Sequence, residues 1–377
     1  MTQAMPTPTS VYVHVPFCRH RCGYCNFTLV AGRDELIARY LQAIELEISK
    51  VKPGRITTLF LGGGTPTHLA IPDLERLLNV LENKFEFAED LEFSIEGNPV
   101  DFDRELVDFL AARKVSRVSL GGQSYNPKKL EFLERDHDEN QIGQAIALIE
   151  SRIKNCSLDL ILGVPGETLE DWSNDLGKTI QHKVQHVSTY SLTIEKGTRF
   201  WNRQNKNRKM TVDETGAVEL YQMAITELRA NGYRHYEVSN FSKPGYECQH
   251  NINYWNGGEY YGFGPGASRY VDRVRATNHQ STSQYLKLVS QGRDPTVERE
   301  EIDNEQSARE KLIFGLRQIE GFQLDDFSSR TGYAVSELVG DELRDLCDAN
   351  LLEVKDGRLR LTLKGLLVSD SLWPRFL

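Results

Sequence analysis

The sequence predicts an α/β protein built on a parallel β-sheet and followed by a smaller helix-rich module. Six short apolar runs, separated by amphipathic stretches, occur between residues 11 and 192. Short apolar runs bounded by Gly, Pro or polar residues are typical of buried parallel strands. Strands that alternate with helices indicate right-handed crossovers, and therefore a barrel, a partial barrel or an open doubly wound sheet. The length of 377 residues exceeds one ordinary core, which predicts a second packing unit.

The expected elements follow one another in a regular order. The strand-like runs lie at 11–15, 58–61, 91–95, 117–120, 158–162 and 186–192. Apolar residues that recur at steps of three and four predict helices near 37–48, 74–81, 106–110, 142–149 and 172–180. Asp103 and Thr168 are the expected N-caps of two of these helices. In all three sheet geometries the carboxyl ends of the strands form one rim, where functional side chains gather.

The pattern changes after residue 195. A helix is expected near 213–231, and the basic run Arg199–Lys209 is expected to be a solvated loop. Residues 233–275 show little periodicity and are expected to be a long irregular segment. Helical periodicity returns near residue 300, and Asp356-Gly357 predicts a hairpin close to the end. This last part resembles a winged helix, but it is not basic, which favours a packing domain over DNA binding. The predicted organisation is a disordered N-terminus (1–10), a sheet domain (11–195), an extension (196–295) and a C-terminal helical module (296–377).

Composition and charge exclude several classes of protein. Hydrophobic residues make up 39% and charged residues 26% of the chain, which excludes collagen-like and largely disordered proteins. The net charge of −9 is spread along the chain, so we expect no nucleic-acid partner. No apolar run approaches the roughly 20 residues that cross a bilayer. The first ten residues lack the basic and apolar segments of a leader, which predicts a cytoplasmic protein.

Three of the six cysteines form a cluster. Cys18, Cys22 and Cys25 follow the spacing C-x3-C-x2-C, directly after the first predicted strand. A structural zinc site is one interpretation, but zinc takes four ligands and the only nearby additions are His14 and His20. Three thiolates in one short loop favour a [4Fe-4S] cluster in which the protein ligates three irons and leaves the fourth open.

Polar residues and glycines mark the rim of the predicted sheet. Most lie at or soon after the end of a predicted strand, whereas one carboxylate lies inside an apolar run. The candidate residues are Gly63, Gly64, Thr65, Glu96, Gln123, Arg135 and Asp159. Glycines allow a ligand to approach the backbone closely, although a tight turn is an alternative. A surface salt bridge or a helix cap is the alternative for each polar residue taken singly.

The segment that contains the cysteines, VYVHVPFCRHRCGYCNF, resembles the radical S-adenosylmethionine (SAM) superfamily. This resemblance implies a partial (β/α)6 TIM-like barrel, a [4Fe-4S] cluster on the three cysteines and SAM bound to the open iron. The chain is most similar to the coproporphyrinogen dehydrogenase-like branch. In that branch the positions that contact SAM correspond here to Tyr12, Gly63, Gly64, Thr65, Glu96, Gln123, Arg135 and Asp159.

Two positions distinguish between two families within this branch. Oxygen-independent coproporphyrinogen III oxidases carry a fourth cysteine two places after the third, and Phe27 occupies that place here. HNINYW, residues 250–255, instead resembles the HNxxYW signature of the heme chaperone HemW family. The resemblance implies heme as cargo and transfer of heme to acceptor proteins, some of them membrane-bound. An oxidase-like enzyme of porphyrin biosynthesis is the alternative, and SAM cleavage and homodimer formation stay open.

His250 is the candidate heme ligand. An imidazole beside Tyr254, Trp255, Tyr260 and Tyr261 offers an iron ligand next to flat apolar surface. The alternative is a packed, hydrogen-bonded histidine.

Overall fold

The computed structural model describes residues 7–206 and 210–377, and its centre is a nine-stranded sheet. The strand order is β11-β1-β4-β5-β6-β7-β8-β10-β9. Its strands are β1 (Ser10–Val15), β4 (Arg55–Gly63), β5 (Glu86–Gly97), β6 (Arg117–Gln123), β7 (Asn155–Leu162), β8 (His186–Ser191), β9 (Arg234–Glu237), β10 (Asn240–Ser242) and β11 (Tyr261–Phe263). All neighbours from β11 to β8 are parallel, whereas β10 pairs antiparallel with β8 and β9. The expected disordered segment lies largely outside the described residues, and β1 begins at Ser10.

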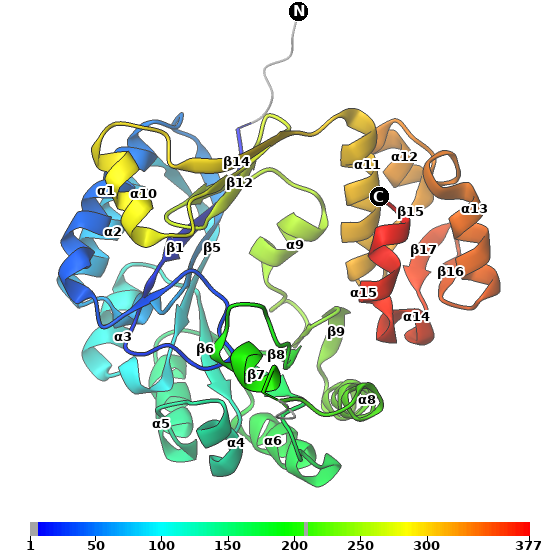
Figure 1. Cartoon of the computed structure of the whole chain (residues 1–377), viewed down its shortest axis with the longest axis horizontal. Helices are drawn as coiled ribbons and strands as arrows, with labels where there is room; N and C mark the ends of the chain where they lie inside the picture. Colours follow the sequence, from blue (N-terminus) through cyan, green and yellow to red (C-terminus); the bar gives the residue numbers. More distant parts are fainter. Residues whose placement is uncertain (1–6, 207–209) are drawn as a thin grey trace, which may run out of the picture.

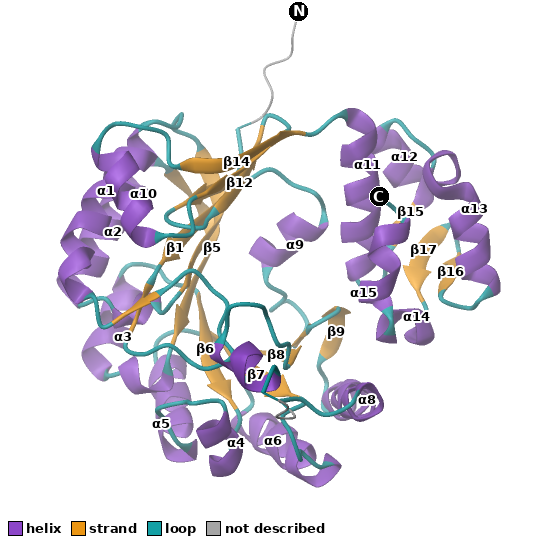
Figure 2. Cartoon of the chain, in the orientation of Figure 1, coloured by secondary structure: helices purple, strands orange, loops and turns teal. Residues whose placement is uncertain are grey.

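Helices connect successive parallel strands and cover the outer face of the curved sheet (Figures 1 and 2). These helices are α1 (Ile37–Ser49), α2 (Ile71–Lys84), α3 (Arg104–Ala112), α4 (Pro127–Phe132), α5 (Glu139–Glu150), α6 (Leu169–His182) and α8 (Glu214–Ala230). The Asp103 side chain accepts the Leu106 N–H at 2.8 Å, and Thr168 accepts the Asp171 N–H at 3.1 Å, so both predicted N-caps are confirmed. The predicted α/β class, a partial barrel with a smaller helical module, is confirmed.

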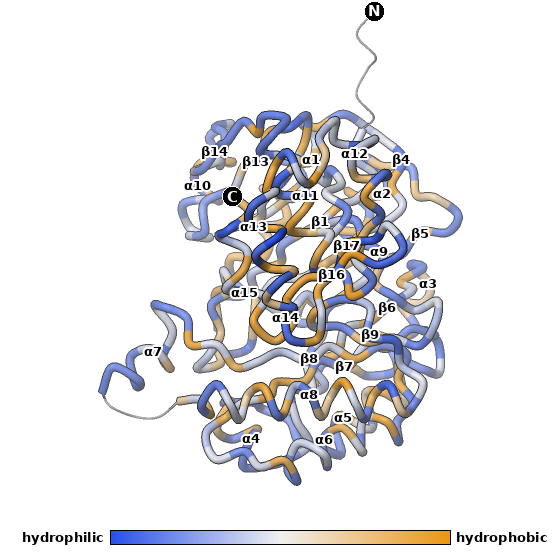
Figure 3. Tube along the Cα trace, turned by 90° about the vertical axis from the view of Figure 1, so that its right-hand side faces the viewer, coloured by the Kyte–Doolittle hydropathy of each residue, from blue (hydrophilic) through white to orange (hydrophobic). Residues whose placement is uncertain are grey.

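The main hydrophobic core lies between the sheet and these helices. Val11, Val13 and Leu59 on the strands and Ile44 and Leu78 on the helices are fully buried in one cluster. Each such side chain contributes roughly 1.5–3 kcal/mol by leaving water. In Figure 3 hydrophobic segments run through the middle of the molecule, and hydrophilic segments dominate its periphery.

The inner face of the sheet is polar. Because side chains alternate along a strand, Ser94, Ser157 and Ser188 face away from the helices, and all three are buried. Buried polar groups usually have partners. Ser157 Oγ lies 2.7 Å from His186 Nδ1 on β8, and Thr58 Oγ1 lies 2.8 Å from His250 Nδ1 on the inner helix, whereas Ser94 Oγ has no partner among the described residues. The inner face therefore forms a buried polar interior rather than a second hydrophobic core.

The segment expected to be irregular, 233–275, contains regular elements, so that expectation was wrong. It forms β9, β10, α9 (Gln249–Trp255), β11, β12 (Ser268–Val271) and the start of β13 (Val274–Asn278). Most of these elements are short and exist through pairing with distant strands, as when β11 adds to β1 with Val11 opposite Tyr261. Local periodicity does not reveal such pairing. β12, β13 and β14 (Thr296–Glu301) form a separate antiparallel sheet, and α10 (Thr282–Ser290) precedes β14.

The basic run is also more ordered than predicted. Arg199–Gln204 forms α7, and Arg199 and Arg203 both pair with Glu134 in the loop after α4. Two cations that share one carboxylate fix this segment against the sheet domain. The end of the predicted run, 207–209, lies outside the described residues.

The C-terminal module contains helices around a three-stranded antiparallel sheet. Its elements are α11 (Asn304–Arg317), β15 (Phe322–Gln323), α12 (Leu324–Thr331), α13 (Val335–Asp348), β16 (Leu352–Lys355), β17 (Arg358–Leu361), α14 (Leu363–Leu367) and α15 (Ser369–Leu372). The predicted hairpin is confirmed: Asp356 and Gly357 have φ angles of 51° and 72°, as a tight turn between β16 and β17 requires.

Helix α9 lies between the two parts of the molecule. It contacts β4 on the inner face of the sheet and α11 of the C-terminal module. Figure 2 shows α9 between the sheet and the C-terminal helices. Among the described residues, no helix has the length and apolar character that crossing a membrane requires.

Candidate functional site

The three clustered cysteines lie on the segment that follows β1. Cys18 ends the two-residue strand β2 (Phe17–Cys18), which pairs with β3 (Val30–Ala31), and Cys22 and Cys25 lie in the loop between them. The Cys25 N–H donates to the Cys22 carbonyl at 3.3 Å, a turn that brings the last two cysteines together. Cys18 and Cys22 are buried and Cys25 is half-buried.

A cavity of about 360 Å³ opens beside these cysteines. It is formed by the cysteine loop and by the carboxyl ends of the parallel strands. Ten predicted site residues line it: Cys18, Cys22, Cys25, Gly63, Gly64, Thr65, Glu96, Gln123, Arg135 and Asp159. The structure therefore brings ten of the twelve predicted residues around one space.

The glycines are required by the chain itself. A Cβ on Gly64 would lie 2.7 Å from the Phe17 carbonyl oxygen, and a Cβ on Gly63 would lie 2.6 Å from the His14 ring. The N–H groups of Gly63, Gly64 and Thr65 already donate, to Glu96 at 2.9 Å and to the carbonyls of Val15 and Phe17 at 2.8 Å. These three N–H groups are therefore engaged within the chain and are not free donors for a ligand.

Two carboxylates share the floor of the cavity. Burial raises the pKa of Glu96 to about 7, the Gly63 N–H opposes this shift, and Asp159 adds to it by repulsion. Burial also raises the pKa of Asp159, which accepts from the Ser119 hydroxyl at 3.1 and 3.2 Å. Carboxylates whose charges are this poorly solvated favour a cationic or hydrogen-bond-donating ligand.

The guanidinium group of Arg135 places a positive charge beside the cysteines. One guanidinium nitrogen lies 3.5 Å from Cys22 Sγ, and another donates to the Gly121 carbonyl at 2.9 Å. Cys18 Sγ lies 3.3 Å from Thr65 Oγ1, and burial raises the pKa of Cys18 to about 12. The free thiol is therefore protonated at neutral pH, and a metal group must displace its proton.

These residues fit a cluster better than a single ion. In the ranges 7–206 and 210–377, no three His, Cys, Asp or Glu side chains are arranged around one metal ion. A cubane does not need such convergence, because each thiolate binds a different iron. Three thiols on one loop at the edge of a cavity, with Arg135 beside them, match that donor set.

Tyr12 and His250 are placed outside this cavity. The Tyr12 hydroxyl lies 3.0 Å from His14 Nδ1, and its ring packs against Phe60 on β4. The His250 ring also packs against Phe60, with ring centroids 5.2 Å apart, and it contacts Thr58 on the same strand. Thr58 and Gly62 are four residues, or roughly 13 Å, apart along β4, and His250 is not among the residues that line the cavity.

Both ring nitrogens of His250 are occupied in this structure. Nδ1 lies 2.8 Å from Thr58 Oγ1, and Nε2 lies 2.8 Å from the Tyr254 hydroxyl. Burial lowers the pKa of His250 to about 3, so the imidazole is neutral, the form that binds iron. The geometry is that of a packed, hydrogen-bonded histidine whose second nitrogen faces the side chain of Tyr254.

Glu92 anchors the helix that carries His250. Its two carboxylate oxygens accept the N–H groups of Gln249 at 2.8 Å and His250 at 2.9 Å, and Cys248 Sγ lies 3.5 Å away. A carboxylate at a helix N-terminus satisfies free N–H groups and complements the helix dipole. An acidic residue at the edge of the third predicted strand was the available signal, and sequence reasoning missed it.

Sequence reasoning also missed part of the cavity wall. Ser119, Tyr190 and Asn98 line the cavity without having been predicted. Phe27, noted above as the residue in place of a fourth cysteine, also lines it and is 64% exposed. Ser119 is opposite Glu96 on the neighbouring strand β6, and Tyr190 is close to the carboxyl end of β8, opposite Ile161. Extending the rim rule to every strand end would have found them.

Two protein-family models match the chain. The radical SAM superfamily model matches residues 12–177, and the HemN C-terminal domain model matches residues 302–368. The coproporphyrinogen III oxidase HemN from Escherichia coli, a radical SAM enzyme, has a TM-score of 0.87 at 22% sequence identity, covering 100% of this chain and 91% of its own. At that identity the likeness shows the fold alone. The radical SAM superfamily model and the cysteine loop at the sheet rim place the chain among the radical SAM proteins.

Full-length relatives narrow the assignment. Heme chaperone HemW of Lactococcus lactis is 34% identical over 371 residues, which is 98% of this chain and 97% of the relative. The Bacillus subtilis HemW is 32% identical over 374 residues, 98% of this chain and 99% of the relative, and the Escherichia coli HemW is 35% identical over 268 residues, 69% of each. The chain belongs to the HemW family.

Proposed function

We propose that this chain is a heme chaperone that carries a [4Fe-4S] cluster with SAM, binds heme and passes it to acceptor proteins. The observation that carries the proposal is membership of a family whose full-length relatives are named heme chaperones. The gathering of ten predicted residues around one cavity supports the cofactor part of it.

In this proposal Cys18, Cys22 and Cys25 hold the cluster and the cavity holds SAM. When bound, such a cluster supplies an open iron for SAM and a source of one electron. The Arg135 guanidinium offsets the negative charge of the thiolates. Glu96, oriented by the Gly63 N–H, and Asp159, oriented by Ser119, accept hydrogen bonds from the polar groups of SAM.

His250 is the proposed iron ligand for heme. Its imidazole is neutral, and Nε2 becomes available when the Tyr254 hydroxyl moves away. Ligation therefore needs a local rearrangement of α9, which is short and is held at its N-terminus by Glu92. Transfer to membrane-bound acceptors, homodimer formation and the cytoplasmic location stay predictions.

Coproporphyrinogen oxidation is the second candidate, favoured by the shared fold with the Escherichia coli oxidase. Phe27 argues against it, because the oxidases carry a cysteine at that position. Anaerobic incubation with coproporphyrinogen III, SAM and a reductant tests the point. Production of protoporphyrinogen in proportion to SAM consumed would place this candidate first.

Titration with hemin tests the chaperone proposal. The anaerobically reconstituted protein is titrated while the Soret band is followed, beside a His250→Ala variant and a His279→Ala control. We expect the Soret band of hemin to shift in the same way with the wild type and the control. With His250→Ala we expect a band that differs from that of the wild type. The absence of any shift in cluster-loaded wild type contradicts the proposal.

A further inference from the structure

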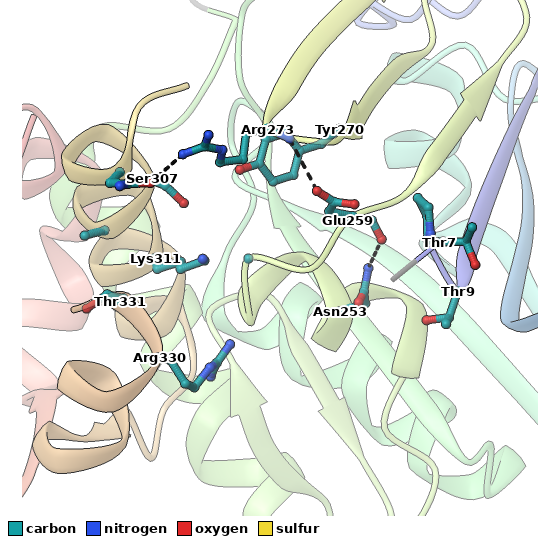
Figure 4. Close-up of a pocket in the computed structure, with 14 residues that line it drawn as sticks. Thr7, Thr9, Asn253, Glu259, Tyr270, Arg273, Ser307, Lys311, Arg330 and Thr331 are labelled. Carbon is teal, nitrogen blue, oxygen red and sulfur yellow. Dashed lines mark hydrogen bonds between the residues drawn. The ribbon is translucent and has the colours of Figure 1, made fainter. Parts of the chain in front are cut away.

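A second cavity, of about 400 Å³, lies apart from the cysteines between the sheet domain and the C-terminal module. Residues 7–9, the end of α9 and the following loop form one side of it, and α11 and α12 form the other. Figure 4 shows Lys311 and Arg330 reaching into this space from α11 and α12, with Glu259 across from them. Neither the cluster nor the SAM site uses this cavity.

Two smaller cavities of about 230 Å³ each adjoin it, and Lys311 lines all three. We call the combined space the α9–α11 cleft and define it by Trp255, Tyr270, Lys311, Phe314 and Arg330. Its volume lies in the range of small-molecule sites, roughly 300–1,000 Å³. The cleft is large enough for a ligand bigger than a single anion.

The cleft carries unbalanced positive charge. Arg273, Lys311 and Arg330 line its largest part with Glu259, and the smaller cavities add Arg275, Arg358, Glu310 and Asp326, so the lining holds five cations and three carboxylates. Lys311 and Arg330 form no ion pair within residues 7–206 and 210–377, and the remaining residues, 1–6 and 207–209, contain no Asp or Glu. Arg330 donates to the Asn256 carbonyl at 2.8 Å. Two neighbouring cations without a carboxylate partner favour an anionic ligand.

Lys311 is held in place beside its cationic neighbour. A Cβ on Gly257 would lie 2.5 Å from Lys311 Cγ, so the lysine stem lies directly against this glycine. Desolvation and then the charge of Arg330 lower the pKa of Lys311. Glu259 and Glu310 oppose this shift, and a carboxylate bound between the two cations would oppose it further.

Another part of the cleft has an aromatic wall. Tyr254, Trp255, Tyr260 and Phe314 line one of the smaller cavities together with Tyr270. The Trp255 Nε1–H is buried and has no acceptor among the described residues. Flat aromatic walls with a few convergent polar groups suit a large planar ligand.

We propose that the α9–α11 cleft binds the heme cargo, with the propionates on Lys311 and Arg330 and the macrocycle against the aromatic wall. This inference rests on the proposed chaperone function and locates its cargo. Charge complementarity fits a dicarboxylate, and the aromatic side chains fit a tetrapyrrole. Tyr254 belongs to both the cleft wall and the His250 hydrogen bond, so the cleft borders the proposed iron ligand.

Heme and heme dimethyl ester, titrated into full-length, cluster-loaded protein, test the proposal. The test variant is Lys311→Gln/Arg330→Gln. The matched control is Arg344→Gln/Lys355→Gln, which removes two exposed cations of the same module outside the cleft. Thermal melting and iron content check that each variant is folded and loaded.

We expect the test variant to bind heme at least about tenfold more weakly than wild type, while the control binds as wild type does. The ester lacks carboxylates, so wild type and test variant are expected to bind it equally. Equal heme affinity of wild type and test variant overturns the location of the site and leaves the chaperone function standing. A loaded wild type that binds no heme overturns the chaperone function itself.

Discussion

Single residues in the cavity beside the cysteines are held in states that cost stability. Glu96 and Asp159 lie near each other with little solvation, and burial raises the pKa of both. Structural carboxylates usually have lowered pKa values, because ion pairs and N–H donors stabilise their charge. Their arrangement here is typical of a site prepared for a ligand.

Glu96→Gln is expected to reduce the pH dependence of stability. The pKa of Glu96 is raised from 4.5 to about 7, so the unfolded chain loses this proton at lower pH than the folded chain. Glu96 therefore lowers the free energy of unfolding as the pH rises from about 4.5 to about 7. Metal-free Glu96→Gln is expected to exceed wild type by about 1 kcal/mol or more at pH 8 and to match it near pH 4.5. Denaturant unfolding of both proteins at both pH values measures this. If Glu96→Gln and wild type differ in stability by the same amount at pH 4.5 and pH 8, the pKa of Glu96 is not raised.

Tyr254→Phe is expected to strengthen heme binding severalfold. The variant removes the hydroxyl that occupies His250 Nε2 and keeps the ring in the cleft wall. It also leaves a buried nitrogen unpaired, which costs the heme-free protein about 1–3 kcal/mol. Hemin titration and thermal melting measure the two effects. Weaker heme binding by a folded Tyr254→Phe protein is inconsistent with ligation through Nε2.

Among the elements, α9 depends on a single carboxylate. Glu92→Gln replaces the charged group that accepts two N–H groups at the start of this helix. We expect a loss of about 1–2 kcal/mol in the free energy of unfolding, with faster amide exchange confined to α9. Glu89→Gln, an exposed change on the same strand, is the control. If the two variants are equally stable, Glu92 does not hold the helix.

The turn after β4 supports the cysteine loop. A Cβ on Gly64 meets backbone atoms of Pro16 and Phe17, which cannot rotate away, so Gly64→Ala must displace the segment leading to Cys18. We expect a loss of about 2 kcal/mol or more and reduced cluster content. Gly177→Ala in α6 has nothing within 4 Å and is expected to be neutral or stabilising. Equal iron content and melting temperature in the two variants would refute this role of Gly64.

Elements with their own sequence period could be predicted, and elements that exist through distant pairing could not. The helix at 139–150 has an apolar stripe formed by Ile142, Ile146 and Ile149, which are spaced three or four residues apart and lie on one face of the helix. In contrast, β11 is three residues long and is a strand because it pairs with β1, about 250 residues earlier. The same reason explains why α7 was expected to be a loop: Glu134, its anchor, lies elsewhere in the sequence.

In the molecule as a whole, the rim of the parallel sheet made most of the candidate site predictable. Residues such as Glu96 and Asp159 come together because parallel strands end on one side, whatever the details of packing. The environment of His250 was not predictable, because it depends on how α9 inserts between the sheet and the C-terminal module. The contacts of His250 with Glu92 and Thr58, and the α9–α11 cleft itself, all result from the position of α9.

The central claim is that Cys18, Cys22 and Cys25 hold an iron-sulfur cluster beside a SAM cavity. Iron and acid-labile sulfide, counted after anaerobic reconstitution of wild type, Cys22→Ala and the control Cys347→Ala, test it most directly. The account predicts about four irons and four sulfides per chain for wild type and control, with a large loss in Cys22→Ala. Wild type without iron, or Cys22→Ala with an unchanged iron and sulfide content, would contradict the account.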